Sequence, residues 1–179
     1  GSALTRFDAA LIFEALAQGC PTVSAFISIH NMASWMIDAY GNDTQRQKWL
    51  PKLCTMELLA SYCLTEPGSG SDAAALRTRA VRDGDHYVVN GQKIWTSRAL
   101  NSDLMTLLVR TNPNEAGYKG LSMLLAEKPR GTDDNPFPAK GMTGGEIEVL
   151  GYRGMKEYEI GFDGFEVPHA NLLGGEEGQ

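Results

Sequence analysis

Apolar residues recur at helical spacing through the first third of the chain. One set lies three or four residues apart: Leu4, Phe7, Leu11 and Ala15. That spacing puts the set on one face of a helix. Gly19 and Pro21 predict a break between this helix and the next. The following segment, up to Tyr40, is apolar around most of its circumference, so we expect a helix that is packed on several sides.

Boundary signals for further helices continue up to residue 58. Gly41 predicts the end of the second helix, and Asn42 or Asp43 is placed to cap the next one. Pro51 predicts that this last helical stretch is divided, because proline lacks the amide hydrogen that an interior helix position uses. We therefore expect helices within residues 3–58.

From about residue 59 the pattern changes to strands and turns. The runs 104–109 and 121–126 are continuously apolar, as in strands that are buried on both faces. Residues 158–162 alternate in polarity, which predicts a half-buried strand. Asn90 and Gly91 lie between two strand-like segments and predict a two-residue hairpin turn, since both residues adopt positive φ readily.

The order of these elements indicates the fold class. Helices come first and strands follow, which is typical of an α+β protein with two segregated parts. We assign residues 1–59 to the helical part and residues 60–172 to the β part. The glycine-rich residues 173–179 would begin a linker, and both ends of the chain read as truncations.

Composition and charge exclude several classes of protein. The 179 residues include 16 basic and 22 acidic side chains with no basic run, which argues against a nucleic-acid-binding surface. No apolar stretch is long enough to span a membrane, and no cluster of His, Asp or Glu predicts a metal site. We interpret Cys20, Cys54 and Cys63 as reduced core residues of an intracellular, non-secreted protein.

Residues 62–72 form the segment that most clearly suggests a binding site. A strand ending at Thr65 leads into a Pro-Gly loop that presents Ser69, Gly70 and Ser71. Such a loop can place backbone N–H groups and hydroxyls against a phosphate or a flavin ring, because glycine permits close approach. It is neither a P-loop nor a dinucleotide fingerprint. Composition alone would favour the alternative of a plain surface turn.

A second candidate segment is residues 91–97. Trp95 is followed by the hydroxyls of Thr96 and Ser97. An aromatic ring can pack against an isoalloxazine, and a hydroxyl can form a hydrogen bond with the ring nitrogens. The alternative is a tryptophan in the core with solvated hydroxyls beside it.

Together the two segments resemble the acyl-CoA dehydrogenase family. Residues 62–72 match its pattern Y-C-L/V-T-E-P-x-x-G-S-D, and G-Q-K-x-W follows at the expected interval. Residues 42–53 and 162–174 resemble the family's helix before the barrel and its exit strand. The family has an N-terminal helical domain, a middle β-barrel and a C-terminal four-helix domain. The resemblance implies that this chain carries the end of the first, all of the mainly antiparallel barrel, and none of the third.

The resemblance also implies FAD as cofactor and a set of residues that bind it. By position in the motifs, these are Tyr62, Leu64, Thr65, Gly70, Ser71, Trp95, Thr96 and Ser97. Ser71 would also lie near the pantetheine arm of an acyl-CoA substrate. Thr65, at the pyrimidine end of the flavin, would help to stabilise the anionic reduced form.

The implied reaction is the α,β-desaturation of an acyl-CoA thioester, with hydride transfer to flavin N5. In the family, the glutamate that removes the α-proton comes from the C-terminal domain. Glu66, Glu157 and Glu159 have no motif that supports this role, so we assign no catalytic residue within the chain. The chain alone is therefore expected to be inactive.

Partners and alternatives follow from the same resemblance. It implies an electron-transferring flavoprotein as redox partner, a homo-oligomer (a tetramer or a dimer), and a location in the bacterial cytoplasm or the mitochondrial matrix. The alternatives are an acyl-CoA oxidase or flavin monooxygenase on the same scaffold, or a non-catalytic scaffold homologue. Arg98 departs from the family pattern, and we interpret it as a surface cation rather than a charge at the mouth of the site.

Overall fold

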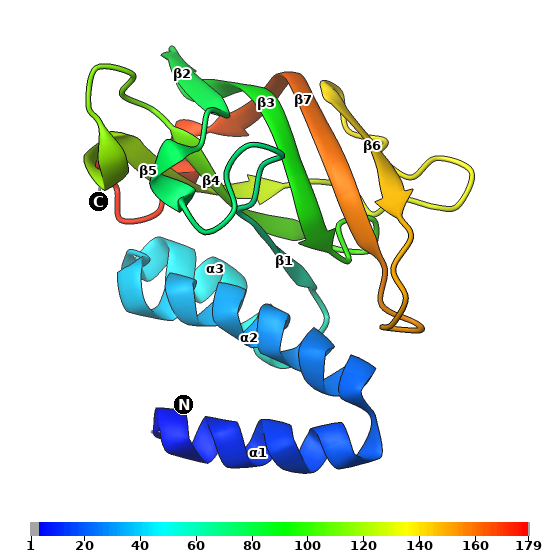
Figure 1. Cartoon of the computed structure of the whole chain (residues 1–179). Helices are drawn as coiled ribbons and strands as arrows, with labels where there is room; N and C mark the ends of the chain where they lie inside the picture. The colour runs from blue at the N-terminus through cyan, green and yellow to red at the C-terminus, as the bar shows by residue number, and fades with distance from the viewer. Residues whose placement is uncertain (1–3, 179) are drawn as a thin grey trace.

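The structure places three helices against a curled, mixed β-sheet (Figure 1). It is a computed structural model that describes residues 4–178. The helices are α1 (Arg6–Gly19), α2 (Pro21–Tyr40) and α3 (Asp43–Cys54). The strands are β1 (Ala60–Cys63), β2 (Arg79–Asp83), β3 (His86–Ser97), β4 (Leu104–Arg110), β5 (Leu121–Glu127), β6 (Met142–Ile147) and β7 (Glu157–Pro168). The predicted α+β class, with helices first and strands after, is confirmed.

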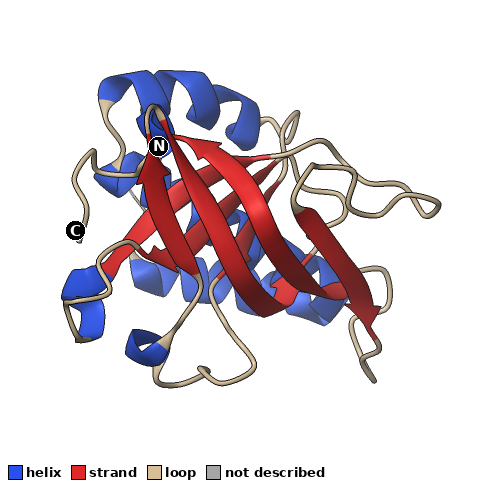
Figure 2. Cartoon of the chain, turned by 90° about the horizontal axis from the view of Figure 1, so that it is seen from above, coloured by secondary structure: helices blue, strands red, loops and turns tan. Residues whose placement is uncertain are grey.

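The sheet curls into a half-barrel whose strands cross one another, as Figure 2 shows. Its order is β1-β4-β2-β3-β7-β6, and β5, which lies off this path, also pairs with β4. Four pairings are antiparallel: β2–β3, β3–β7, β6–β7 and β4–β5. The pairings of β1 and β2 with β4 are parallel, so the sheet is mixed although most of its pairings are antiparallel.

The helix boundaries follow the capping residues. Asn42 forms a capping box with Gln45 at the start of α3, and Pro21 occupies the first position of α2. The predicted division at Pro51 is wrong, because α3 continues to Cys54. Pro51 lies in the last turn of α3, where the loss of one amide hydrogen affects only the end of the helix.

The predicted hairpin at Asn90 and Gly91 is also wrong. Both residues lie inside the continuous strand β3, where the pairing with β7 shifts register after Val89. Gly91 has φ +149°, and a Cβ there would lie 2.6 Å from Thr78 Oγ1. The glycine is therefore required by the close approach of Thr78 rather than by a turn. The turn between β2 and β3 uses Gly84, with φ +62°.

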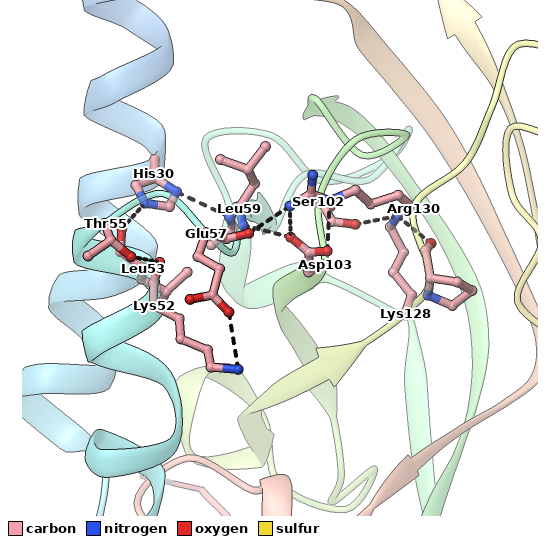
Figure 3. Close-up of polar contacts among 12 residues, drawn as sticks. His30, Lys52, Leu53, Thr55, Glu57, Leu59, Ser102, Asp103, Lys128 and Arg130 are labelled. Carbon is pink, nitrogen blue, oxygen red and sulfur yellow. Dashed lines mark hydrogen bonds and ion pairs between the residues drawn. The ribbon is translucent and has the colours of Figure 1, made fainter.

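Hydrogen bonds join the helices to the start of the sheet (Figure 3). His30 Nδ1 accepts from the Ala60 amide at 3.1 Å, so Nε2 carries the proton and donates to the Leu53 carbonyl at 2.9 Å. His30 belongs to the buried core, since the residue is 8% exposed. Asp103 accepts from the Leu59 amide at 2.7 Å and so fixes the entry into β1.

Two apolar clusters stabilise the fold. One fills the concave side of the half-barrel and the other lies between α2, α3 and the sheet. Strands β4 and β5 contribute to both, which confirms the interpretation of the apolar runs 104–109 and 121–126 as strands buried on both faces. Of the predicted core cysteines, Cys63 is buried, whereas Cys20 and Cys54 are exposed.

Helix α1 packs on α2, on the side away from the sheet (Figure 1). It has no buried residue, and Leu4, Phe7 and Leu11 are about half exposed or more. Phe7, Leu11 and Ala15 lie in α1 as their spacing predicts, whereas Leu4 precedes the N-cap Thr5. The rest of residues 4–178 does not cover the face that carries Phe7 and Leu11. No helix in this part of the chain is long and apolar enough to cross a membrane.

Candidate functional site

The two candidate segments lie side by side in the structure. The Ile94 amide donates to the Thr65 carbonyl at 2.8 Å, and Ser61 Oγ donates to the Ser97 carbonyl at 2.8 Å. The end of β1 is thus bonded along the second half of β3. Two segments about thirty positions apart in sequence are thereby held next to each other. The structure therefore brings together Tyr62, Leu64 and Thr65 with Trp95, Thr96 and Ser97.

The loop that follows β1 is organised by its own polar groups. The Glu66 carboxylate accepts from the amides of Arg77 and Thr78 at 2.7 and 2.9 Å. Ser69 is 5% exposed, and its amide and carbonyl pair with those of Glu66. Gly70 and the residue after it are exposed, and a Cβ on Gly70 would meet nothing within 4 Å. The loop therefore presents Gly70 and Ser71 to open space from an ordered base.

A buried ion pair ties this loop to β3. Lys93 Nζ donates to Glu66 Oε1 at 2.9 Å and to the Leu64 carbonyl at 2.8 Å. The Lys93 side chain is 0% exposed and that of Glu66 is 8% exposed. Sequence reasoning missed this pair. The available signal was that both Glu66 and Lys93 lie inside the two motifs, where a charged residue is otherwise unexplained.

Burial and hydrogen bonding oppose each other at this ion pair. Burial alone would raise the pKa of Glu66, but hydrogen bonds from Thr78, Lys93 and the Arg77 amide outweigh it, so the pKa lies below its usual value. Burial lowers the pKa of Lys93, and Glu66 opposes that shift. The carboxylate therefore stays ionised at neutral pH and is fully occupied as an acceptor. It is not available to act as a base.

Trp95 stands out from the strand that carries it. The pairing of β3 with β7 is irregular between Lys93 and Thr96, and Trp95 has φ +56°. Its side chain is 51% exposed, whereas Thr96 and Ser97 are buried. The alternative of a tryptophan in the core is therefore wrong. The bulge turns the indole outward, and positive φ in a tryptophan is the kind of backbone strain that gathers at functional sites.

A pocket of about 510 Å³ opens beside Trp95. Its lining includes Pro21, Thr22, Trp95, Ser97, Tyr152 and Glu157. Ser97 Oγ donates to Glu157 Oε1 at 2.6 Å across the β3–β7 pairing. Burial raises the pKa of Glu157, and the hydrogen bond from Ser97 opposes the shift. The pocket thus combines an aromatic wall with a hydroxyl and a buried carboxyl group.

Arg98 directly follows Thr96 and Ser97, at the end of β3. Its guanidinium carbon lies 3.3 Å from the centroid of the Phe26 ring in α2, and its φ is +60°. Burial lowers the pKa of Arg98 to about 10. The interpretation of Arg98 as a plain surface cation is wrong, because the side chain is half-buried and connects the strand to the helix.

Comparisons with known proteins agree with this arrangement. The sequence pattern of "Acyl-CoA dehydrogenase, middle domain" matches residues 61–165, and that of "Acyl-CoA dehydrogenase, N-terminal domain" matches residues 1–57. A (2S)-methylsuccinyl-CoA dehydrogenase from Cereibacter sphaeroides is 52% identical over the whole chain, which covers 33% of that protein. A mitochondrial isobutyryl-CoA dehydrogenase from Dictyostelium discoideum is 48% identical over the whole chain, which covers 41% of it.

A similar fold has been solved before. The crystal structure of an acyl-CoA dehydrogenase from Geobacillus kaustophilus superposes with a TM-score of 0.86 at 35% identity, over 99% of this chain and 45% of that one. The chain therefore spans between a third and a half of the length of these relatives.

Replacement of Lys93 should destabilise the protein strongly. Lys93→Met leaves Glu66 buried without its partner, so we expect the free energy of unfolding to fall by about 3–5 kcal/mol, measured by urea denaturation. The pKa of Glu66 is lowered in the folded state, so the stability it contributes is present above its unfolded pKa and is lost as pH falls through its folded pKa. In Lys93→Met the folded-state pKa of Glu66 should rise toward or above its unfolded value, so the additional loss of stability in acid should be smaller than in the wild type.

The matched control is Lys156→Met. Lys156 pairs with Glu146 at the surface, where both side chains are about half exposed. It should leave the unfolding midpoint unchanged. Equal stability of the Lys93 and Lys156 variants would show that the buried pair does not hold the site together.

Proposed function

The chain belongs to the acyl-CoA dehydrogenase family, and from this premise we propose that it forms the flavin-facing part of an enzyme that dehydrogenates an acyl-CoA thioester. The observation that carries the proposal is that two hydrogen bonds join residues at and just after β1 to the second half of β3, which places the half-exposed Trp95 next to Thr65 and Ser97. A plain turn after β1 and a core tryptophan would need neither the bulge nor the buried ion pair beneath them.

The residues present fit FAD as the cofactor. An outward-turned indole offers a flat apolar face, and the space in front of Gly70 admits a group against the backbone of the loop. Tyr62, Leu64, Thr65, Gly70, Ser71, Trp95 and Ser97 are the residues that we propose hold it, and Thr96, which is 0% exposed, would support them from the interior. When bound, FAD supplies the hydride acceptor of the reaction.

The residues of this chain would bind and orient the cofactor and the substrate. They would not remove the substrate proton. Thr65 offers a hydroxyl and a backbone already fixed by Ile94, and Ser71 offers an exposed hydroxyl toward the acyl-CoA. Glu66 is held in an ion pair with Lys93, and Glu159 is exposed to solvent on β7. As the family resemblance implies, we propose that the catalytic base lies outside residues 1–179 and that the chain alone does not turn over substrate.

The organisation and partners that we propose follow the family. Residues 1–59 would belong to the helical domain, residues 60–172 to the flavin-binding barrel, and residues 173–179 to a linker. The full-length protein would form a homo-oligomer and pass electrons to an electron-transferring flavoprotein. Relatives named as mitochondrial and relatives from bacteria support a matrix or cytoplasmic location.

The proposed reaction is tested by anaerobic reduction of the flavin. The full-length protein that contains this chain would be purified with FAD and mixed with isobutyryl-CoA and butyryl-CoA. We expect the flavin absorbance to bleach, and to recover with an electron-transferring flavoprotein faster than with O₂. Faster recovery with O₂ would instead indicate an oxidase. A protein that binds no FAD would contradict the proposal and indicate a scaffold.

Removal of the indole should weaken cofactor binding. Trp95→Ala deletes the aromatic face, so we expect the dissociation constant for FAD to rise about tenfold in the full-length protein. The control is Trp35→Ala, because Trp35 is also about half exposed but lies in α2 and packs against Tyr40. Fluorescence titration of the apoprotein with FAD measures both. An unchanged affinity in Trp95→Ala would show that the indole does not contact the flavin.

A further inference from the structure

The glycine-rich residues 173–178 are fixed against the sheet, although their composition is typical of a flexible linker. Gly174, Gly175 and Gly178 have φ of +80° to +83°, which residues with a side chain rarely adopt. A Cβ on Gly178 would lie 2.5 Å from the Lys119 carbonyl oxygen. Glycine is therefore required at this position by close packing against a neighbouring turn.

Two backbone amides bond this segment to β5. The Leu173 amide donates to the Met123 carbonyl at 2.9 Å, and the Gly178 amide donates to Ser122 Oγ at 3.0 Å. Ser122 is 1% exposed, and its hydroxyl also pairs with that of Thr111 at 2.7 Å. The segment is thus bonded near both of its ends to a strand of the sheet, and the end of the described chain lies beside β5 (Figure 1).

A buried tyrosine holds the last turn of the segment. The Tyr87 hydroxyl, from β3, donates to Glu177 Oε1 at 2.8 Å. Tyr87 is 0% exposed, and its ring stacks on that of His169 with the centroids 5.6 Å apart. Burial and the hydrogen bond to Glu177 raise the pKa of Tyr87 to about 12, so the hydroxyl stays protonated at neutral pH and remains a donor. A carboxylate acceptor makes this hydrogen bond stronger than one between neutral groups.

The helical part contacts the same stretch of chain. Gln45 in α3 is 4% exposed, and its side-chain amide donates to the carbonyls of Ala170 and Leu172, both at 2.9 Å. Helix α3 and strands β3 and β5 therefore all bond to residues 170–178. The path by which the backbone leaves the sheet is determined by these three elements rather than by the segment itself.

Strand β3 connects this path to the candidate site. Tyr87 lies near the start of β3, and Trp95 and Ser97 lie near its end, so the two regions belong to one strand that pairs with β7 along its length. The proposed catalytic base lies outside residues 1–179, and the family resemblance places it after residue 179. A chain that leaves β3 in a fixed direction would carry the base to a defined place relative to the flavin.

We propose that Tyr87 and Glu177 are positioning residues for the dehydrogenation, because their hydrogen bond fixes residues 173–178 and thereby the place of the base relative to the flavin. The inference rests on the proposed function, since it takes the base to follow residue 179. Neither side chain touches substrate or cofactor in this account. A misplacement of about 1 Å can slow a reaction about a hundredfold, so a contact far from the site can control the rate.

The first measurement is hydrogen–deuterium exchange of the full-length, FAD-loaded protein, followed in peptides that cover residues 173–178. We expect slow exchange in the wild type, because amides in this segment are hydrogen-bonded. In Tyr87→Phe, which removes only the hydroxyl, exchange should be about tenfold faster. The control Tyr118→Phe removes a hydroxyl from a residue that is 70% exposed and should behave as the wild type.

The second measurement is the rate constant for anaerobic flavin reduction at saturating acyl-CoA, with whichever of isobutyryl-CoA and butyryl-CoA reduces the wild type faster. In Tyr87→Phe we expect this rate constant to fall about tenfold, while the dissociation constant for FAD and the half-saturating acyl-CoA concentration stay within about twofold of the wild type. Glu177→Ala should match Tyr87→Phe. Glu177→Gln keeps an acceptor oxygen and should restore most of the rate.

The outcomes separate this inference from the proposed function. Fast exchange of residues 173–178 in the wild type would overturn the inference and leave the acyl-CoA proposal standing. Reduction of Tyr87→Phe at the wild-type rate would do the same, as would a loss of FAD affinity as large as the loss of rate, because that pattern indicates a purely structural role. A wild type that binds no FAD, or that neither thioester reduces, would overturn both.

Discussion

The buried ion pair between Lys93 and Glu66 is the constraint on which the rest of the site depends. A lysine ammonium group with no exposure to water must find its acceptors within the protein, and it finds them on Glu66 and on the Leu64 carbonyl. Glu66 in turn fixes the amides of Arg77 and Thr78. One side chain therefore sets the positions of β1's end, the loop after it and the approach to β2.

Strand β3, which contains Lys93, also contains the strained backbone that determines which side chains are exposed. With Lys93 held inside, the bulge that follows turns Trp95 outward and returns Thr96 and Ser97 to the interior. Trp95 and Arg98 both adopt positive φ, which costs free energy at residues with large side chains. Such a backbone persists because its neighbours fix it from both sides.

Much of the fold follows from local patterns in the sequence. Helix boundaries at Gly19, Gly41 and Asn42 and the doubly buried strands depend on periodicity and capping, which act over a few residues. The sequence-based prediction of the hairpin is wrong because a segment distant in sequence determines the conformation there. Asn90 and Gly91 have the composition of a hairpin turn, but the approach of Thr78 makes the glycine necessary inside a strand.

The site was predictable in part for the same reason. The two motifs identify residues 62–72 and 91–97 as candidate segments. The structure joins these segments, but no local sequence pattern predicts that they are neighbours. Glu157 could not be recognised from sequence, because its meaning depends on Ser97 lying opposite it in the β3–β7 pairing. Burial, rather than residue type, distinguishes it from the exposed Glu159 on the same strand.

The central claim is that the Lys93–Glu66 pair holds residues 62–72 and 91–97, which we propose face the flavin, as one unit. The most direct measurement is a double-mutant cycle on the FAD dissociation constant of the full-length protein, with Lys93→Met, Glu66→Gln and the combination. If the pair acts as a unit, the double variant should lose much less affinity than the sum of the single losses, with a coupling free energy of about 1–3 kcal/mol. Strictly additive losses, or FAD affinities that none of the three variants changes, would contradict the account.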